Sequence, residues 1–328
     1  MVKKLAELKG DLVATCIPSI SKSMVAAVRV LVTDDDAAAV RSFLVEDEGI
    51  ASSSLFLRHN IEKNGRHLSP DEGKPFQGTY VGIFGVEGRL RGVAGHFWHC
   101  KIILQAPILE DVPFLVLKLL EMSNKQSGRP IDGLIGPWDQ VQAGREALRI
   151  SDERLSLNSC ELVFDLPISE LILSQGRHGQ ELEARAAVEG DLDTLAMWSV
   201  EYNNEMNLGA VSIDVARSRL RAKISDGSLW VLLDKGMLVA QSSFNVCVRE
   251  TVQLAGIFVP QPRRRCGYAR YLIGAHLDHA RRTMSVGRCC LFTGKDNVAS
   301  QRCYNALGFR ANGKLYGMSF WKPPADDE

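Results

Sequence analysis

The stretch at residues 252–270, VQLAGIFVPQPRRRCGYAR, limits the possible folds more than any other part of the chain. Its first eight residues form an apolar run rich enough in β-branched residues to predict a strand buried on both faces. Pro260 and Pro262 end that strand, because proline has no backbone N–H to donate. From Tyr271 the apolar residues recur at helical spacing, so the arginine-rich turn before them opens a helix.

A turn of this kind predicts an anion site. The unpaired amide groups at the start of a helix and the helix dipole both favour negative charge. Gly267 and Ala269 are small enough for a ligand to approach the backbone, and Arg264 and Arg265 add positive charge. We therefore predict a cradle for a pyrophosphate, although the small residues by themselves would equally suit a tight turn without a ligand.

Composition narrows the class of partner and compartment. The 328 residues include 39 Lys and Arg and 39 Asp and Glu, so no net charge attracts the chain to nucleic acid or to a membrane. Eight cysteines without disulfide-dense spacing indicate a reducing compartment, and no apolar run reaches the roughly 20 residues of a spanning helix. We expect a cytoplasmic protein without nucleic-acid or membrane partners, in an oligomeric state that the sequence leaves open.

The order of the predicted elements indicates an α/β protein with a mixed sheet. We expect an N-terminal extension at 1–26, a first domain at 27–166, a linker at 167–182 and a second domain at 183–328. In each domain a strand, two helices, a β-hairpin and a further strand precede an alternation of helix and strand. The first domain is predicted to close with the strand CELVFDL at 160–166, and the second with GKLYGMSFWK at 313–322.

The two domains are copies of one plan. Residues 87–97 align with 235–244, which start 148 residues later, and residues 142–148 align with 301–307, which start 159 residues later. The offset grows because the second half has the Arg-x-x-Gly-x-Ala turn and the first half lacks it. Only the second half is therefore predicted to bind a pyrophosphate.

Two motifs in the second half resemble those of one family. Arg264-x-x-Gly267-x-Ala269 resembles the [QR]-x-x-G-x-[GA] motif of the GNAT acetyltransferase superfamily, and residues 297–300 and 303–309 resemble its closing N-x-x-[AS]…Y-x-x-x-G-F run. The resemblance covers residues 183–321 well and the first half as a degenerate copy. It implies a tandem GNAT-like acyl-CoA N-acyltransferase fold, with acetyl-CoA as co-substrate and only the second domain catalytic.

The resemblance also implies roles for particular residues. Tyr304 matches the general acid that protonates the departing thiolate, and a backbone amide near Ile257 or Phe258 would hold the acyl oxygen. The residues implied to bind coenzyme A are Ile257, Phe258, Val259, Arg264, Arg265, Cys266, Gly267, Tyr268, Ala269, Arg270, Asn297 and Ser300.

The general base is left open. Many family members place a glutamate on the central strand, where this chain has residues 253–256, QLAG, without a carboxylate. Glu250 and Asp296 are the nearest substitutes, and a relay through water is a third possibility. The histidine pairs at 96 and 99 and at 276 and 279 lack a third ligand nearby, so we expect no metal.

The sequence thus predicts an acetyl-CoA-dependent N-acetyltransferase that acts on an amine of a small molecule or peptide by direct transfer in a ternary complex. The alternative is a non-catalytic acyl-CoA-binding sensor, and a nucleic-acid-modifying enzyme is disfavoured by the balanced charge. We expect the first domain to form a wall of the acceptor pocket through Phe97, Trp98 and His99. Neither the acceptor nor an acyl group other than acetyl can be named from the sequence.

Overall fold

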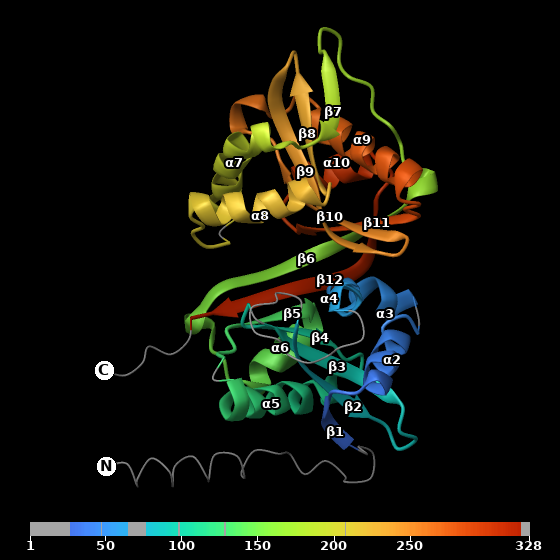
Figure 1. The fold of residues 1–328 in the computed structure, drawn as a ribbon, viewed down its shortest axis with the longest axis vertical. Coiled ribbons are helices and arrows are strands. Elements are labelled where there is room, and N and C mark those ends of the chain that lie inside the picture. The colour runs from blue at the N-terminus through green and yellow to red at the C-terminus, as the bar shows by residue number, and fades with distance from the viewer. Residues whose placement is uncertain are drawn as a thin grey trace, which may run out of the picture.

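One mixed sheet of twelve strands runs through the whole molecule. Its strand order is β1-β2-β3-β4-β5-β12-β6-β11-β10-β9-β8-β7. The computed structural model describes residues 27–46, 48–64, 77–97, 99–127, 129–206 and 208–322. The predicted extension at 1–26 and Trp98 lie outside these ranges. The first half of the chain occupies one end of the sheet and the second half the other, with β6 and β12 running side by side between them (Figure 1).

The first half contains the predicted hairpin and the predicted strands and helices. Its elements are β1 Ala27–Leu31, α2 Asp34–Phe43, α3 Glu48–Ser53, α4 Leu55–Asn64, β2 Gly78–Phe84, β3 Leu90–Phe97, β4 Lys101–Gln105, α5 Val112–Met122, β5 Gly133–Pro137, α6 Trp138–Ala147 and β6 Leu155–Pro167. The stretch 52–65, which the serines at 52–54 predict to open a helix, contains that helix as α4, and α3, which ends at Ser53, is an additional short helix. The buried hydroxyl of Ser54 donates to the carbonyl of Leu44, 3.0 Å away.

The second half repeats that order of elements. They are β7 Leu182–Ala186, α7 Leu192–Glu205, α8 Ile213–Ser225, β8 Leu229–Asp234, β9 Met237–Val248, β10 Thr251–Phe258, α9 Tyr268–Thr283, β11 Arg288–Gly294, α10 Val298–Asn305 and β12 Arg310–Trp321. The hairpin turns at Lys235 and Gly236 as predicted, with positive φ at both. Helix α9 begins three residues before the predicted start, because Gly267 caps it with a φ of 86°.

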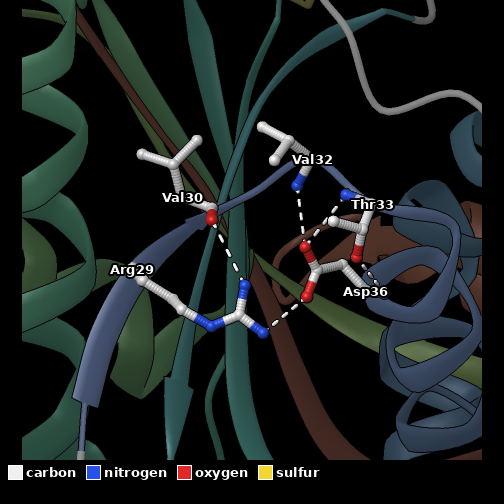
Figure 2. A network of polar contacts seen from close by, with 5 residues as sticks. All are labelled: Arg29, Val30, Val32, Thr33 and Asp36. Atoms are coloured by element: carbon white, nitrogen blue, oxygen red, sulfur yellow. Dashed lines mark hydrogen bonds and ion pairs between the residues drawn. The ribbon is translucent and has the colours of Figure 1, made fainter.

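Asp36 fixes the start of α2. Its carboxylate accepts hydrogen bonds from the amides of Val32 and Thr33 and from the guanidinium of Arg29, while the Thr33 hydroxyl accepts from the Asp36 amide (Figure 2). Burial opposes the charge on this carboxylate. The bonds from Arg29, Thr33 and Val32 outweigh it and hold the pKa of Asp36 well below its usual range. The helix cap is therefore Thr33, with Asp36 completing a capping box.

The two halves exchange their last strands. Strand β6 pairs with β11 of the second half, and the C-terminal strand β12 pairs with β5 of the first half. The two exchanged strands also pair with each other over most of their length (Figure 1). Between β6 and β7, in the predicted linker, the chain forms a single 3-10 turn at Ile168–Glu170. The division at 27–166, 167–182 and 183–328 stays a prediction.

Helix α4 of the first half packs on the sheet of the second half. Leu55 and Phe56 pack against Val246, Val248 and Cys290, which lie on β9 and β11. Because directly paired residues share a face of a sheet, this is the face that also carries Gln253 of β10. Helices α9 and α10 cover the opposite face, where Leu254 and Phe164 pack against Ile273 and Tyr304. The second half's sheet thus has one face partly covered by the first half.

Candidate functional site

Strands β10 and β11 separate partway along their length. They pair in parallel only from Thr251–Gln253 to Arg288–Cys290, although β10 continues to Phe258 and β11 to Gly294. On its other side β10 pairs with β9 with two irregularities in register, and Gly256, which lies within the second, has a φ of 58°. This splay leaves the edge of residues 254–258 open toward β11.

A cavity of about 1180 Å³ lies where the strands part. It is bounded by β10, the turn before α9, helices α7, α8 and α10, and the exchanged strands β6 and β12. This volume exceeds the roughly 300–1,000 Å³ of most small-ligand sites, so it can hold two substrates together.

The cradle predicted at the start of α9 has the backbone that an anion site needs. Arg265 and Gly267 both have positive φ, 65° and 86°, and the helix starts at the next residue. The amides of the first helical turn have no carbonyl partner within the helix and point out of its end. Arg265 and Arg270 line the same cavity, as does Arg177 from the segment before β7. The geometry and the charge of the turn both suit a pyrophosphate.

The charge of Arg264 is balanced within the protein by the carboxylate of Glu205. Its guanidinium donates to both carboxylate oxygens of Glu205, at 2.8 and 2.7 Å, and to the carbonyl of Val259, at 2.9 Å. Glu205 ends α7. The pair therefore ties α7 to the turn and fixes one wall of the cavity.

Tyr304 lies in the cavity wall on the α10 side. Its ring packs against Phe164 and Phe309, each with a centroid separation of 6.0 Å. Burial raises the pKa of Tyr304 well above its usual range, against a smaller lowering effect of a hydrogen bond with Ser300. The phenol therefore keeps its proton at neutral pH, which is the state that a general acid requires.

Most of the residues predicted to bind coenzyme A line this one cavity. Those that do are Ile257, Phe258, Val259, Arg264, Arg265, Gly267, Tyr268, Ala269, Arg270, Asn297 and Ser300. Cys266 does not, and its thiol lies 3.6 Å from the carbonyl of Arg264. The Asn297 side chain caps α10 by accepting from the amide of Ser300, and the Tyr268 hydroxyl donates to Asp234. Contact of these residues with coenzyme A stays a prediction.

The structure does not bring Glu250 or Asp296 to the cavity. Glu250 is exposed in the turn before β10, and at about 3.3 Å per residue it lies roughly 25 Å from the open end of that strand. Asp296 is exposed in the turn before α10, where its carbonyl accepts from the amide of Val298. Neither carboxylate is placed to take a proton from a substrate in the cavity.

Besides Glu205, which is paired with Arg264, the cavity is lined by a second carboxylate that was not predicted from the sequence, Glu161. It lies on β6, directly across from Gly294 of β11 and Tyr316 of β12. Burial raises the pKa of Glu161, and a hydrogen bond from the Ser159 hydroxyl opposes this. The signal that could have found it is a carboxylate inside the apolar run CELVFDL, since such a group is costly to bury without a function.

Two buried amide oxygens in the cavity wall also have no partner. The Oε1 atoms of Gln241 and Gln253 accept no hydrogen bond from the described residues, although their Nε2 atoms donate to backbone carbonyls. Both side chains line the cavity and are only 4% exposed. Buried acceptors are normally satisfied, so these two oxygens indicate a ligand or ordered water with N–H or O–H donors.

The first half contributes to the cavity, but through other residues than predicted. Phe97 is fully buried against Tyr80, its ring stacks on His99, and neither Phe97 nor His99 lines the cavity. The lining residues from this half are Phe56 of α4, Ile135 of β5 and Glu161 of β6. The expected lining by Phe97 and His99 is wrong, because Phe97 packs into the core of the first half and holds the His99 ring against it.

Two features are absent from the described part of the chain. No group of three or more His, Cys, Asp or Glu side chains there is placed to hold a metal ion. None of the helices there is long and apolar enough to cross a membrane.

Comparisons with known proteins agree with the fold. Residues 187–309 match the family model described as Acetyltransferase (GNAT) family. The chain is similar to the structure of a GCN5-related N-acetyltransferase from Sphaerobacter thermophilus, with 14% identity, a TM-score of 0.58 and coverage of 94% of this chain and 99% of that one. No curated protein matches the sequence.

Two further structures share the fold. An acetyltransferase from the GNAT family of Colwellia psychrerythraea is 14% identical, covers 90% of this chain and 99% of its own, and has a TM-score of 0.53. A tandem GNAT protein from the clavulanic acid biosynthesis pathway is 13% identical, with coverage of 92% and 99% and a TM-score of 0.54. At these identities the likeness shows the fold alone.

A mixed α/β sheet that splays beside a helix N-terminus defines the class of acyl-CoA N-acyltransferase folds, here in tandem. Within that class, residues 187–309 are a domain of the GNAT acetyltransferase family, and the predicted resemblance is confirmed.

Proposed function

We propose that the chain is an N-acetyltransferase that moves an acetyl group from acetyl-CoA directly to an amine of a small molecule or peptide. The observation that carries this proposal is one cavity that joins the opened edge of β10, the cradle before α9 and Tyr304. Family membership of residues 187–309 supports acetyl-CoA as the co-substrate. The first half would complete the cavity without a cradle of its own, since β4 leads to α5 without an equivalent turn.

The cradle and the opened strand would hold the acyl donor. The amides at the start of α9 and the side chains of Arg265 and Arg270 are suited to the pyrophosphate. The edge of residues 254–258 that faces β11 pairs with no strand and would offer backbone groups to the pantetheine amides. A backbone amide near Ile257 or Phe258 would hold the acyl oxygen, and such a fixed donor stabilises developing negative charge by a few kcal/mol (about 2.7–4).

Tyr304 would protonate the leaving sulfur. Its phenol keeps its proton because the side chain is buried, and Ser300 shares a hydrogen bond with it. The ordinary pKa values of a phenol and a thiol are about 10 and 8.5, and burial of Tyr304 widens this gap, so the proton transfer would have to accompany cleavage of the carbon–sulfur bond. General acid catalysis of this kind contributes about 10²–10⁴-fold to the rate.

A non-catalytic acyl-CoA-binding protein is the second candidate. The observation that favours it is Gln253 on the central strand, an amide that cannot take a proton from an amine. Binding without turnover would then account for the cradle and the splay. A cytoplasmic location and the absence of nucleic-acid or membrane partners stay predictions.

Release of free thiol from acetyl-CoA in the presence of a panel of amines separates the two candidates. We expect thiol release with at least one amine, and a kcat about 100-fold lower for Tyr304→Phe. Tyr271→Phe is the matched control, because Tyr271 lies on α9 outside the cavity, and it should behave as the wild type. Coenzyme A binding with no thiol release across the panel would favour the sensor, and equal rates for Tyr304→Phe and Tyr271→Phe would remove the acid role.

A further inference from the structure

An apolar trough forms the part of the cavity between the two halves. Its floor is the sheet face that carries Phe292 of β11 and, at alternate positions of β12, Tyr316, Met318 and Phe320. Ile135 of β5 lies directly across from Met318. Phe56 of α4 covers this floor, with ring centroids 6.1 Å from Phe292 and 5.8 Å from Tyr316.

The sheet register places Glu161 beside the floor of this trough. Tyr316 lies across from Glu161 on one side, and Gly294 lies across from it on the other. Strands β10 and β11 no longer pair beyond Gln253 and Cys290. Glu161 and Ile257 both line the cavity that lies where these strands have parted. Tyr304 approaches the cavity from the other face of the sheet.

The contacts of Glu161 within the described part of the chain are polar but uncharged. The Ser159 hydroxyl donates to its Oε1 at 3.2 Å, and no Lys, Arg or His of the described ranges forms an ion pair with it. The titratable groups that face it are Tyr202 on α7 and Tyr304 on α10, with Cys160 beside it on β6. Lys295, which acts electrostatically on Cys160, is exposed in the turn after β11. A carboxylate in such a wall lacks a positively charged partner, and an ammonium group would supply one.

We propose that the acceptor is a primary amine on an apolar or aromatic body, that this body lies in the trough, and that Glu161 binds the ammonium group and takes its proton. The inference rests on the proposed acetyl transfer and names the acceptor class of the same site. The six apolar residues of the trough favour an acceptor with an apolar or aromatic group, and Glu161 favours an acceptor with a positively charged amine. A strand of the first half thereby supplies a catalytic residue to the second.

In the proposed acetyl transfer, both protons that leave the acceptor nitrogen have a defined destination. An ammonium proton passes to the Glu161 carboxylate and later leaves to solvent, and the freed nitrogen lone pair forms the bond to the acetyl carbon. The carbon–sulfur bond breaks with its electron pair on sulfur, which takes the Tyr304 proton. The nitrogen loses a second proton as the amide forms, and this proton restores the phenol.

The acceptor class is tested on the wild-type protein with one primary amine that carries an aromatic ring and one that carries a hydroxyl group. We expect kcat/KM for 2-phenylethylamine to exceed that for ethanolamine by about 30-fold or more, since burying a phenyl ring favours binding strongly. 3-Phenylpropan-1-ol, which has the ring without the charge, should neither react nor compete well. Equal kcat/KM values for the two amines would overturn the apolar trough as the acceptor site.

The role of Glu161 is tested with Glu161→Gln against the matched control Glu153→Gln, which changes an exposed carboxylate outside the cavity. We expect Glu161→Gln to lower kcat/KM for 2-phenylethylamine about 100-fold at pH 7. The loss should shrink toward pH 10, because an amine with a pKa of about 10 then needs no base. A loss that is constant with pH, or no loss relative to Glu153→Gln, would overturn the role.

Binding measurements separate failure of this inference from failure of the proposed function. With coenzyme A bound, calorimetry should detect 2-phenylethylamine binding to wild type and at least tenfold weaker binding to Glu161→Gln. If acetyl-CoA is turned over with other amines while 2-phenylethylamine neither binds nor reacts, only the acceptor class is wrong. If no amine is acetylated, the proposed function fails together with it.

Discussion

Gly267→Ala tests the cradle at the residue on which its shape depends. Gly267 has a φ of 86°, a left-handed conformation that residues with a Cβ adopt at a cost. A Cβ at this position would stand 3.8 Å from Nε of Arg177, which lines the same cavity, so the methyl group would point into the cradle without a clash in the free protein. The substitution therefore strains the backbone and narrows the anion site.

The backbone strain and the narrowed anion site change the free energies of folding and of binding by different amounts. Left-handed strain costs about 1–2 kcal/mol, and the lower entropy of the unfolded alanine chain offsets about 0.4–1 kcal/mol, so the net loss of stability is about 1 kcal/mol. Loss of one hydrogen bond to a phosphate oxygen costs about 1.5–3 kcal/mol, which raises Kd by about 10- to 150-fold. Coenzyme A binding should suffer more than folding does.

The control is Gly313→Ala. Gly313 lies in β12 with a φ of 78°, a Cβ added there would meet no other atom within 4 Å, and the residue does not line the cavity. Both variants should lower the urea midpoint by similar amounts. Only Gly267→Ala should weaken coenzyme A binding in a calorimetric titration. Wild-type Kd values for both variants would refute the cradle as the pyrophosphate site.

Two further predictions concern buried polar groups. Burial lowers the pKa of Lys223 from 10.5 to about 8, so above pH 8 the unfolded chain holds this proton and the folded chain loses it. Folding stability should therefore rise with pH from about 8 to 10.5 relative to Lys223→Met, by about 3 kcal/mol at most, and a difference in urea midpoints that is the same at pH 7.5 and 10 would contradict this. The Tyr80 hydroxyl is fully buried, and no described residue hydrogen-bonds to it. Tyr80→Phe should then stabilise the protein by about 1 kcal/mol in urea unfolding, and a loss of that size would show that the hydroxyl has a partner.

The cradle could be predicted because its signals are local. Two prolines end β10, Gly267 provides the positive φ, and the arginines and the helix follow within a few residues. Each of these features acts through the conformation of its own residue or its immediate neighbours. Only the helix start was displaced, because Gly267 caps α9 directly.

The exchange of β6 and β12 could not be predicted in the same way. The alternation of apolar residues in CELVFDL specifies which side chains face the core, but not which strand lies alongside. Sequential strands are neighbours in most sheets, so each closing strand was assigned to its own half. Because Glu161 reaches the cavity only through this exchange, the search for a base was confined to the second half.

Acetyl transfer at the shared cavity is tested most directly by mass spectrometry with acetyl-CoA that carries deuterium in the acetyl group. Incubation with 2-phenylethylamine should give the deuterated amide, one molecule for each thiol released, and less of it with Tyr304→Phe. Binding of coenzyme A without any labelled amide, from this amine or any other of the panel, would contradict the assignment.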